Sequence, residues 1–162
     1  MASVQTKNLV YSGLLIALSV IGSYVKLGPW SIGLDSTAGF LAALTLGPAA
    51  GALVCAIGHL AVAMVTGFPL TPVFHLAVAV AMAGVGAAGG LVVKRFGPLA
   101  AAVTMVLLNG AAAPALLALL PNPMGLGLFA ALVAPLTLAA AVNAGAALLV
   151  YGMLSKVRVL KP

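Results

Sequence analysis

The chain has very few ionisable residues. Of its 162 residues, 5% are charged and one is acidic, Asp35. A pair of carboxylates for general acid–base catalysis is therefore excluded within the chain. The single cysteine, Cys55, likewise excludes an internal disulfide and a cysteine-rich metal site. The sequence contains no phosphate-binding glycine motif and no Ser-His-Asp arrangement that can be placed, so we do not expect an enzyme.

Hydrophobic residues make up most of the sequence. They account for 64% of the chain, and the mean hydropathy is +1.30, which lies far outside the range of soluble domains. Because one helical crossing needs about 20 apolar residues, the chain has room for five to seven spans. The apolar runs are continuous, whereas the strands of a β-barrel alternate apolar and polar residues. We therefore predict an all-α membrane protein with one domain, residues 1–162.

Gly-Pro breaks and basic residues divide the apolar sequence into six predicted spans. These spans cover about residues 7–26, 36–47, 49–66, 73–93, 99–120 and 126–154. The basic residues stand at the ends of the runs, where they set the topology instead of forming a nucleic-acid patch. With the turn at Lys94 and Arg95 in the cytoplasm, alternation of the spans places both termini in the cytoplasm. Three loops then lie outside, at residues 27–35, 67–71 and 121–125.

Ionisable side chains near the outer loops are candidates for function. Inserting such a group at membrane depth costs about 3 kcal/mol of free energy, so the group normally faces protein or a water-filled cavity. Asp35 lies at the start of the second span, where it caps the helix, contacts a ligand, or both. His75 lies about one turn inside the fourth span, and its ring can stack on a flat ligand. For His59, deeper in the third span, we predict an interhelical hydrogen bond, with substrate contact as the alternative.

The two histidines and the carboxylate also raise the possibility of a metal site, because this set of ligands suits several divalent ions. The spacing argues against it. His59 and His75 are sixteen residues apart across a Gly-Pro loop and are not four residues apart on one helix. We therefore predict no metal site and assign the two histidines separate roles.

Two asparagines lie within predicted spans. The amides of Asn109 and Asn143 must find partners in the membrane interior, and helix packing is their default role. Pro114 and Pro135 lie in the outer halves of the same spans, where each frees backbone carbonyls and is expected to bend its helix. Two such bends would open a pocket on the outer side.

The order of these motifs resembles that of the S components of energy-coupling factor (ECF) vitamin transporters. The resemblance rests on "LDS" at Leu34–Ser36, "LGPAAGA" at Leu46–Ala52 and "GFPLTP" at Gly67–Pro72, and it extends over nearly the whole chain. It implies a substrate-binding subunit of an ABC importer in the bacterial plasma membrane, which captures a vitamin or its precursor from outside. The partners implied are a transmembrane coupling protein and two ATPases. The subunit would topple in the bilayer while the ATPases use ATP, so no cofactor is implied in this chain.

The resemblance also implies roles for individual residues. Gly13 and Ala17 are the nearest match to the family's Ala-x-x-x-Ala pattern, which packs against the coupling protein; packing within the subunit is the alternative. Ser19 and Ser23 form a second small pair. The family's pocket corresponds here to Trp30, Asp35, Phe68, His75, Asn109 and Asn143. Trp30 alternatively anchors the chain at the membrane interface.

The predicted pocket indicates the kind of substrate. It has aromatic faces, one carboxylate and two amides, with no arginine or lysine deep in the bilayer, which disfavours phosphorylated or polycarboxylate substrates. A neutral nucleoside-like heterocycle fits, and the sequence is most similar to the group assigned to α-ribazole, a cobalamin precursor. Thiamine, riboflavin, a pyridoxal-type vitamin and queuosine precursors remain alternatives.

Two other functions compete with vitamin capture. One is a membrane scaffold or assembly subunit without transport activity, whose polar residues only hold helices together. The other is the metal-binding subunit of a related nickel or cobalt transporter. That subunit carries a histidine directly after the initiator methionine, whereas this chain begins Met1-Ala2.

Overall fold

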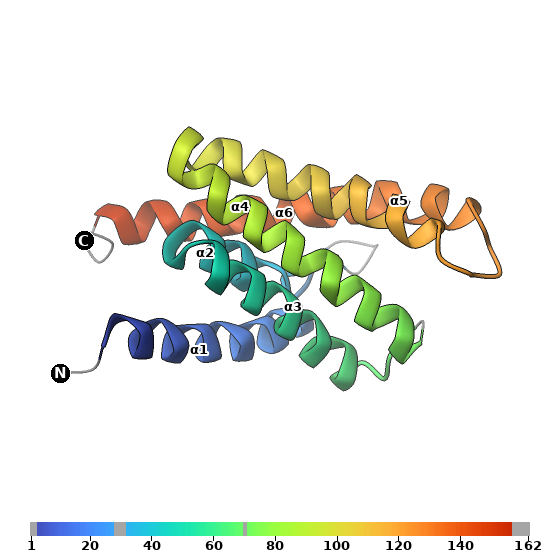
Figure 1. Ribbon diagram of the computed structural model, residues 1–162, viewed down its shortest axis with the longest axis horizontal. Helices are drawn as coiled ribbons and strands as arrows, with labels where there is room; N and C mark the ends of the chain where they lie inside the picture. The colour runs from blue at the N-terminus through green and yellow to red at the C-terminus, as the bar shows by residue number, and fades with distance from the viewer. Residues whose placement is uncertain (1–2, 28–31, 70, 157–162) are drawn as a thin grey trace.

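The protein is a bundle of helices (Figure 1). The structure, a computed structural model, describes residues 3–27, 32–69 and 71–156. Its helical elements are α1 (Val4–Tyr24), α2 (Thr37–Leu46), α3 (Pro48–Val65), α4 (Pro72–Leu107), the π-helical turn η1 (Leu108–Ala112), α5 (Ala113–Ala118) and α6 (Gly127–Lys156). Two short antiparallel strands, β1 (Lys26–Leu27) and β2 (Ile32–Gly33), stand between α1 and α2 where the sequence predicted a loop. The predicted all-α class is confirmed.

Within the described residues, four helical stretches are long and apolar enough to cross a membrane. They are Val4–Tyr24, Pro48–Val65, Pro72–Ala118 and Gly127–Lys156, so the chain is a multi-pass membrane protein. The second predicted span is different. With ten residues, α2 extends about 15 Å at 1.5 Å per residue, which is about half of the 30 Å hydrocarbon core. On its own, α2 is too short to cross.

The long α4 helix turns back on itself at one glycine. Gly97 has φ 84° and ψ 175°, which is not helical and lies at a φ that favours glycine. Gly97 divides α4 into a first arm, residues 72–96, and a second arm, residues 98–107. Pro98 begins the second arm, where the first N–H groups of a helix have no intrahelical acceptor, so that the missing N–H of proline loses no hydrogen bond. The sequence predicted separate helices over 73–93 and 99–120 with a longer break between them. That prediction was wrong about the break, because a single residue makes the turn.

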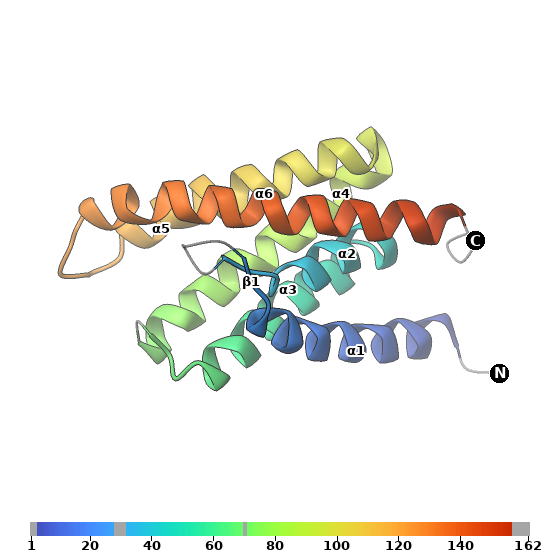
Figure 2. The same ribbon diagram turned by 180° about the vertical axis from the view of Figure 1, so that it is seen from behind.

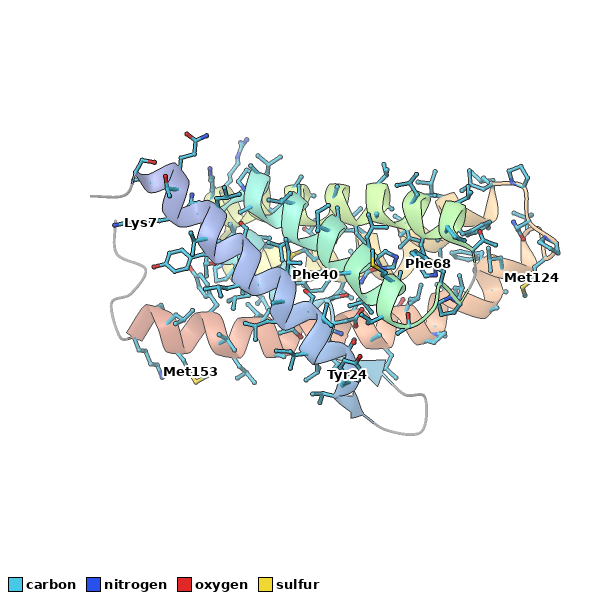
Figure 3. The ribbon with its side chains drawn as sticks, turned by 90° about the horizontal axis from the view of Figure 1, so that it is seen from below. Lys7, Tyr24, Phe40, Phe68, Met124 and Met153 are labelled. Carbon is cyan, nitrogen blue, oxygen red and sulfur yellow. The ribbon has the colours of Figure 1, made fainter. Side chains whose placement is uncertain are left out.

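The start of the first helix and the end of the last lie at one end of the bundle, and two of the loops lie at the opposite end (Figures 1 and 2). The start of α1, the turn at Gly97 and the end of α6 lie at one end, which we call the basic end because Lys7, Lys94, Arg95 and Lys156 belong to these segments. The α3–α4 loop and the α5–α6 loop lie at the other, which we call the loop end. Figure 3 shows Lys7 and Met153 at the basic end and Phe68 and Met124 at the loop end. Arg158, Lys161 and the side chain of Lys26 lie outside the described residues.

The "LGPAAGA" motif brings two helices into backbone contact. Gly47, at φ 95°, makes the turn between α2 and α3, and Pro48 opens α3. One turn later, Gly51 faces Gly86 of α4 so closely that a Cβ added at Gly51 would lie 2.7 Å from the Gly86 carbonyl oxygen. Small residues permit this approach, which van der Waals packing stabilises in a membrane. The contact fixes α3 against the first arm of α4.

The core lies among α2, α3, α4 and α6. Its largest fully buried side chains include Phe40, Val54 and Met105, and Phe40 stands near the middle of the bundle in Figure 3. α1 lies at the edge: 11% of its most apolar 18 residues are buried, against 22–33% in the other three long stretches. Its inward face carries Ser12, Ser19 and Ser23.

Candidate functional site

The α3–α4 hairpin brings the two histidines together. Nε2 of His59 lies 3.1 Å from Nδ1 of His75, within hydrogen-bond distance. The rings are stacked, with centroids 5.3 Å apart and planes inclined by 29°. The interhelical hydrogen bond expected for His59 is present, and its partner is His75 itself. The two side chains, to which the sequence assigned separate roles, are therefore in direct contact.

A third ring completes the cluster. Phe68 contacts His75 edge-on, with centroids 5.6 Å apart and planes at 66°. Its backbone has φ 50°, uncommon for a bulky residue, and its N–H donates to the carbonyl of Ala63 at 2.8 Å. The loop thereby holds the Phe68 ring over the end of the histidine pair. We call His59, Phe68 and His75 the ring cluster.

The sequence contained a signal for this pairing that composition and motif analysis missed. His59 lies eight residues before Gly67 (67 − 59) and His75 eight residues after it (75 − 67). In an antiparallel helical hairpin, residues at equal distances from the turn lie side by side. Counting outward from "TGFP" would have paired the two histidines.

Asp35 and His59 line the same small cavity. Its volume is about 10 Å³, about the space that one water molecule needs. The lining residues are Ser19, Asp35, Ser36, Gly39, Val54, Cys55, His59 and Met82. Of the two roles considered for Asp35, the N-cap position itself belongs to Ser36, because α2 begins at Thr37. This leaves Asp35 just outside the helix, at the cavity.

Asn143 has protein partners on every side. Its side chain is 1% exposed, and its Oδ1 accepts from the Thr37 hydroxyl at 2.8 Å. Its Nδ2 donates to the carbonyls of Gly33 and Ala139, both at 2.9 Å. The amide of Asn143 thus connects α6 to the start of α2 and to β2 by hydrogen bonds, which is the helix-packing role expected by default. It does not line the small cavity.

Asn109 lies in the π-helical turn that precedes Pro114. A regular helix would direct the N–H of residue 114 to the carbonyl of Gly110, but proline has no N–H and its ring clashes there. The chain widens instead, and the N–H of Ala113 donates to the Leu108 carbonyl, five residues back. The bend expected from Pro114 therefore takes the form of a π turn. Asn109 is half-buried and, like Asn143, is absent from the small cavity.

The remaining predicted residues lie away from the ring cluster. Gly13 and Ala17 are exposed on α1, and nothing lies within 4 Å of a Cβ added at Gly13. Ser19 and Ser23 are buried against the bundle, so this second small pair faces inward and is unavailable to a partner. Trp30 lies outside the described residues.

An open apolar groove of about 640 Å³ lies at the loop end, apart from the ring cluster. It is lined by Thr71, Val73, Phe74, Leu76, Ala77, Val80, Leu120, Pro121 and Pro123. One hydroxyl, that of Thr71, is the only polar side-chain group in that lining. The predicted polar residues do not reach it.

Sequence comparison with known families identifies the chain. The family described as "ECF transporter, substrate-specific component" matches residues 7–155, nearly the whole length. The chain is an ECF transporter S component. Neither the curated proteins nor the solved structures give a significant match. An S component is a transport subunit that pairs with the ECF energy-coupling module, and it is not an enzyme.

Proposed function

We propose that this S component captures a neutral, flat heterocycle of the nucleoside type on the outer side of the membrane, with α-ribazole as the best single candidate. The observation that supports it is the ring cluster, which borders a cavity lined by one carboxylate and two serine hydroxyls. Stacked rings suit a flat heterocycle, and Asp35 suits ribose hydroxyls. No lysine or arginine lines the cavity, which disfavours an anionic substrate.

Capture requires the cavity to open. A volume of about 10 Å³ is far below the roughly 300–1,000 Å³ of a site for a small organic ligand. Phe68 is the group whose displacement would open the ring cluster toward the loop end. Its left-handed backbone costs about 1–2 kcal/mol, and moving out of that conformation returns this energy.

We further propose that the protein crosses the membrane six times, with α2 and residues 32–36 before it together making the second crossing, and that both termini lie in the cytoplasm, so that the loop end faces outward. The basic end then carries Lys7, Lys94, Arg95 and Lys156 inside, as the positive-inside rule requires. Gly13 and Ala17 contact the coupling protein, because α1 is the least buried long helix and both positions are open. The subunit topples with its substrate, and the two partner ATPases use the ATP.

Native mass spectrometry of protein purified from rich medium tests the substrate. We expect one co-purified small molecule of the mass of a vitamin or precursor, at one per protein. Binding of α-ribazole, thiamine, riboflavin and pyridoxal to the emptied protein then gives the specificity. An empty protein that binds none of these compounds contradicts the proposal.

The competing functions give different results in the same assays. For a scaffold subunit, D35N and H75N would change stability, and no saturable binding would exist. For a metal-binding subunit, purified protein would bind nickel or cobalt tightly. Among the described residues, no group of three or more His, Cys, Asp or Glu side chains is placed to hold a metal ion.

A further inference from the structure

Nε2 of His75 is a buried polar atom that has no hydrogen-bond partner among the described residues. The residue is 8% exposed, and its other ring nitrogen is occupied by His59. Buried polar atoms are nearly always hydrogen-bonded, so an exception of this kind needs an explanation. Its place beside the Phe68 ring, at the loop end, indicates a contact that is completed by a ligand.

What this atom offers depends on His59. A neutral imidazole carries one proton, on either Nδ1 or Nε2. If His59 donates through Nε2, His75 must carry its own proton on Nε2 and is a donor toward a ligand. If His75 donates through Nδ1, its Nε2 has a free lone pair and is an acceptor. The hydrogen bond between the two rings therefore couples their tautomers.

The small cavity favours the second arrangement. Its walls include the Asp35 carboxylate and the Ser19 hydroxyl, and Ser19 donates its proton to the carbonyl of Leu15 at 3.3 Å. The Ser19 oxygen therefore has its lone pairs left as acceptors, and an ionised carboxylate has acceptor atoms only. His59 lines this cavity, and because its Nε2 faces His75, Nδ1 is the other polar atom of its ring. Acceptors around the ring favour a proton on Nδ1. Nε2 of His59 then accepts from Nδ1 of His75.

We propose that His59 and His75 act as one coupled acceptor, in which Nε2 of His75 accepts a hydrogen bond from an N–H or O–H group of the substrate. This inference rests on the proposed function and narrows it. A substrate that presents a ring N–H, an exocyclic amine or a hydroxyl at this point is accepted. One that presents a carbonyl or carboxylate oxygen there is rejected, because two acceptors would face each other without water.

Nitrogen NMR of the whole protein in lipid nanodiscs, labelled with ¹⁵N-histidine, tests the tautomers directly. The chain has two histidines, so H59Q assigns the imidazole signals. We expect protonated Nδ1 and unprotonated Nε2 in both rings of the wild-type protein. A proton on Nε2 of His75 overturns the proposal. Zinc at micromolar concentration that shifts both rings together overturns it in favour of a metal site.

Binding of α-ribazole to two matched variants tests the contact. H75N keeps a polar group near the position of Nδ1, facing His59, but removes Nε2, whereas H75Q keeps a carbonyl acceptor near Nε2 and gives up Nδ1. We expect H75N to bind about tenfold to hundredfold more weakly and H75Q to lose less. Wild-type affinity in a folded H75N overturns the contact. If the wild-type protein binds no compound of the vitamin panel, the proposed function fails, while the NMR signals still decide the tautomer.

Discussion

Gly86→Ala tests whether the backbone contact between α3 and α4 holds the ring cluster together. A Cβ at position 86 would lie 2.9 Å from the backbone nitrogen of Ala52 and closer still to the Gly51 carbonyl. Gly84 is the matched control on the same helix, because nothing lies within 4 Å of a Cβ there. Both changes replace glycine by alanine in α4, so any gain in helix propensity cancels between them.

The magnitude follows from the geometry. Ordinary contact needs about 3.4 Å or more, so α3 and α4 must separate by about 0.5–1.2 Å. Overpacking of this kind costs about 1–3 kcal/mol. The same separation stretches the 3.1 Å contact between His59 and His75 to roughly 4 Å, which loses about 0.6 kcal/mol or more. We expect G86A to be about 2–4 kcal/mol less stable than G84A.

Reversible unfolding in mixed micelles of mild detergent and dodecyl sulfate gives the free energies of unfolding. The ¹⁵N signals of the two histidines report the pair in the same samples. We expect the hydrogen bond between the rings to be lost in G86A and kept in G84A. Equal stability of the two variants, with an intact histidine pair in both, would refute the reasoning from backbone contact.

Three further outcomes follow from individual contacts. N143L should lower the free energy of unfolding by about 1–3 kcal/mol, because it leaves the Gly33 carbonyl without its Asn143 donor and the Thr37 hydroxyl without its Asn143 acceptor. Unfolding in mixed micelles measures this free energy. Wild-type stability would show that the hydrogen bonds between α2 and α6 contribute nothing. G110A should cost about 1–3 kcal/mol because its Cβ would lie 2.5 Å from the Thr137 Cα, whereas G127A, with nothing within 4 Å, serves as the control. G13L should weaken co-purification with the coupling module at least about tenfold while substrate affinity stays unchanged, because a leucine side chain prevents the close approach of helices that small residues permit. G145L changes an equally open glycine on α6 and should co-purify normally. Equal recovery of both variants would show that Gly13 is not part of the interface.

Much of the fold follows from apolar runs and their breaks. Continuous runs predicted helices, and "LGPAAG" correctly marked the turn at Gly47. The sequence pattern did not predict the backbone geometry at two positions where a single residue changes the course of a helix. Gly97 reverses the chain alone, and Pro114 produces a π turn in place of a kink. Neither effect appears in hydropathy, because the first depends on a backbone dihedral angle and the second on a backbone hydrogen bond.

The candidate site was predicted less completely. Individual residues were found because ionisable and amide groups are rare in an apolar chain. Their partners were not, because partners depend on helix register. Asp35 was considered for the N-cap position, which Ser36 holds one residue later. The histidines were judged by their separation along the chain, whereas their equal distance from Gly67 determines that they meet.

The amide of Asn143 has a consequence for the order in which the protein is made. Its bonds join residues 106 and 110 positions apart in the chain, and they fix the segment that carries Asp35 to the last helix. During synthesis, α2 and the preceding strands leave the ribosome long before α6 does. The wall of the small cavity therefore acquires its final anchor only when the whole chain has been inserted. A truncated or stalled product would carry the ring cluster but not this anchor.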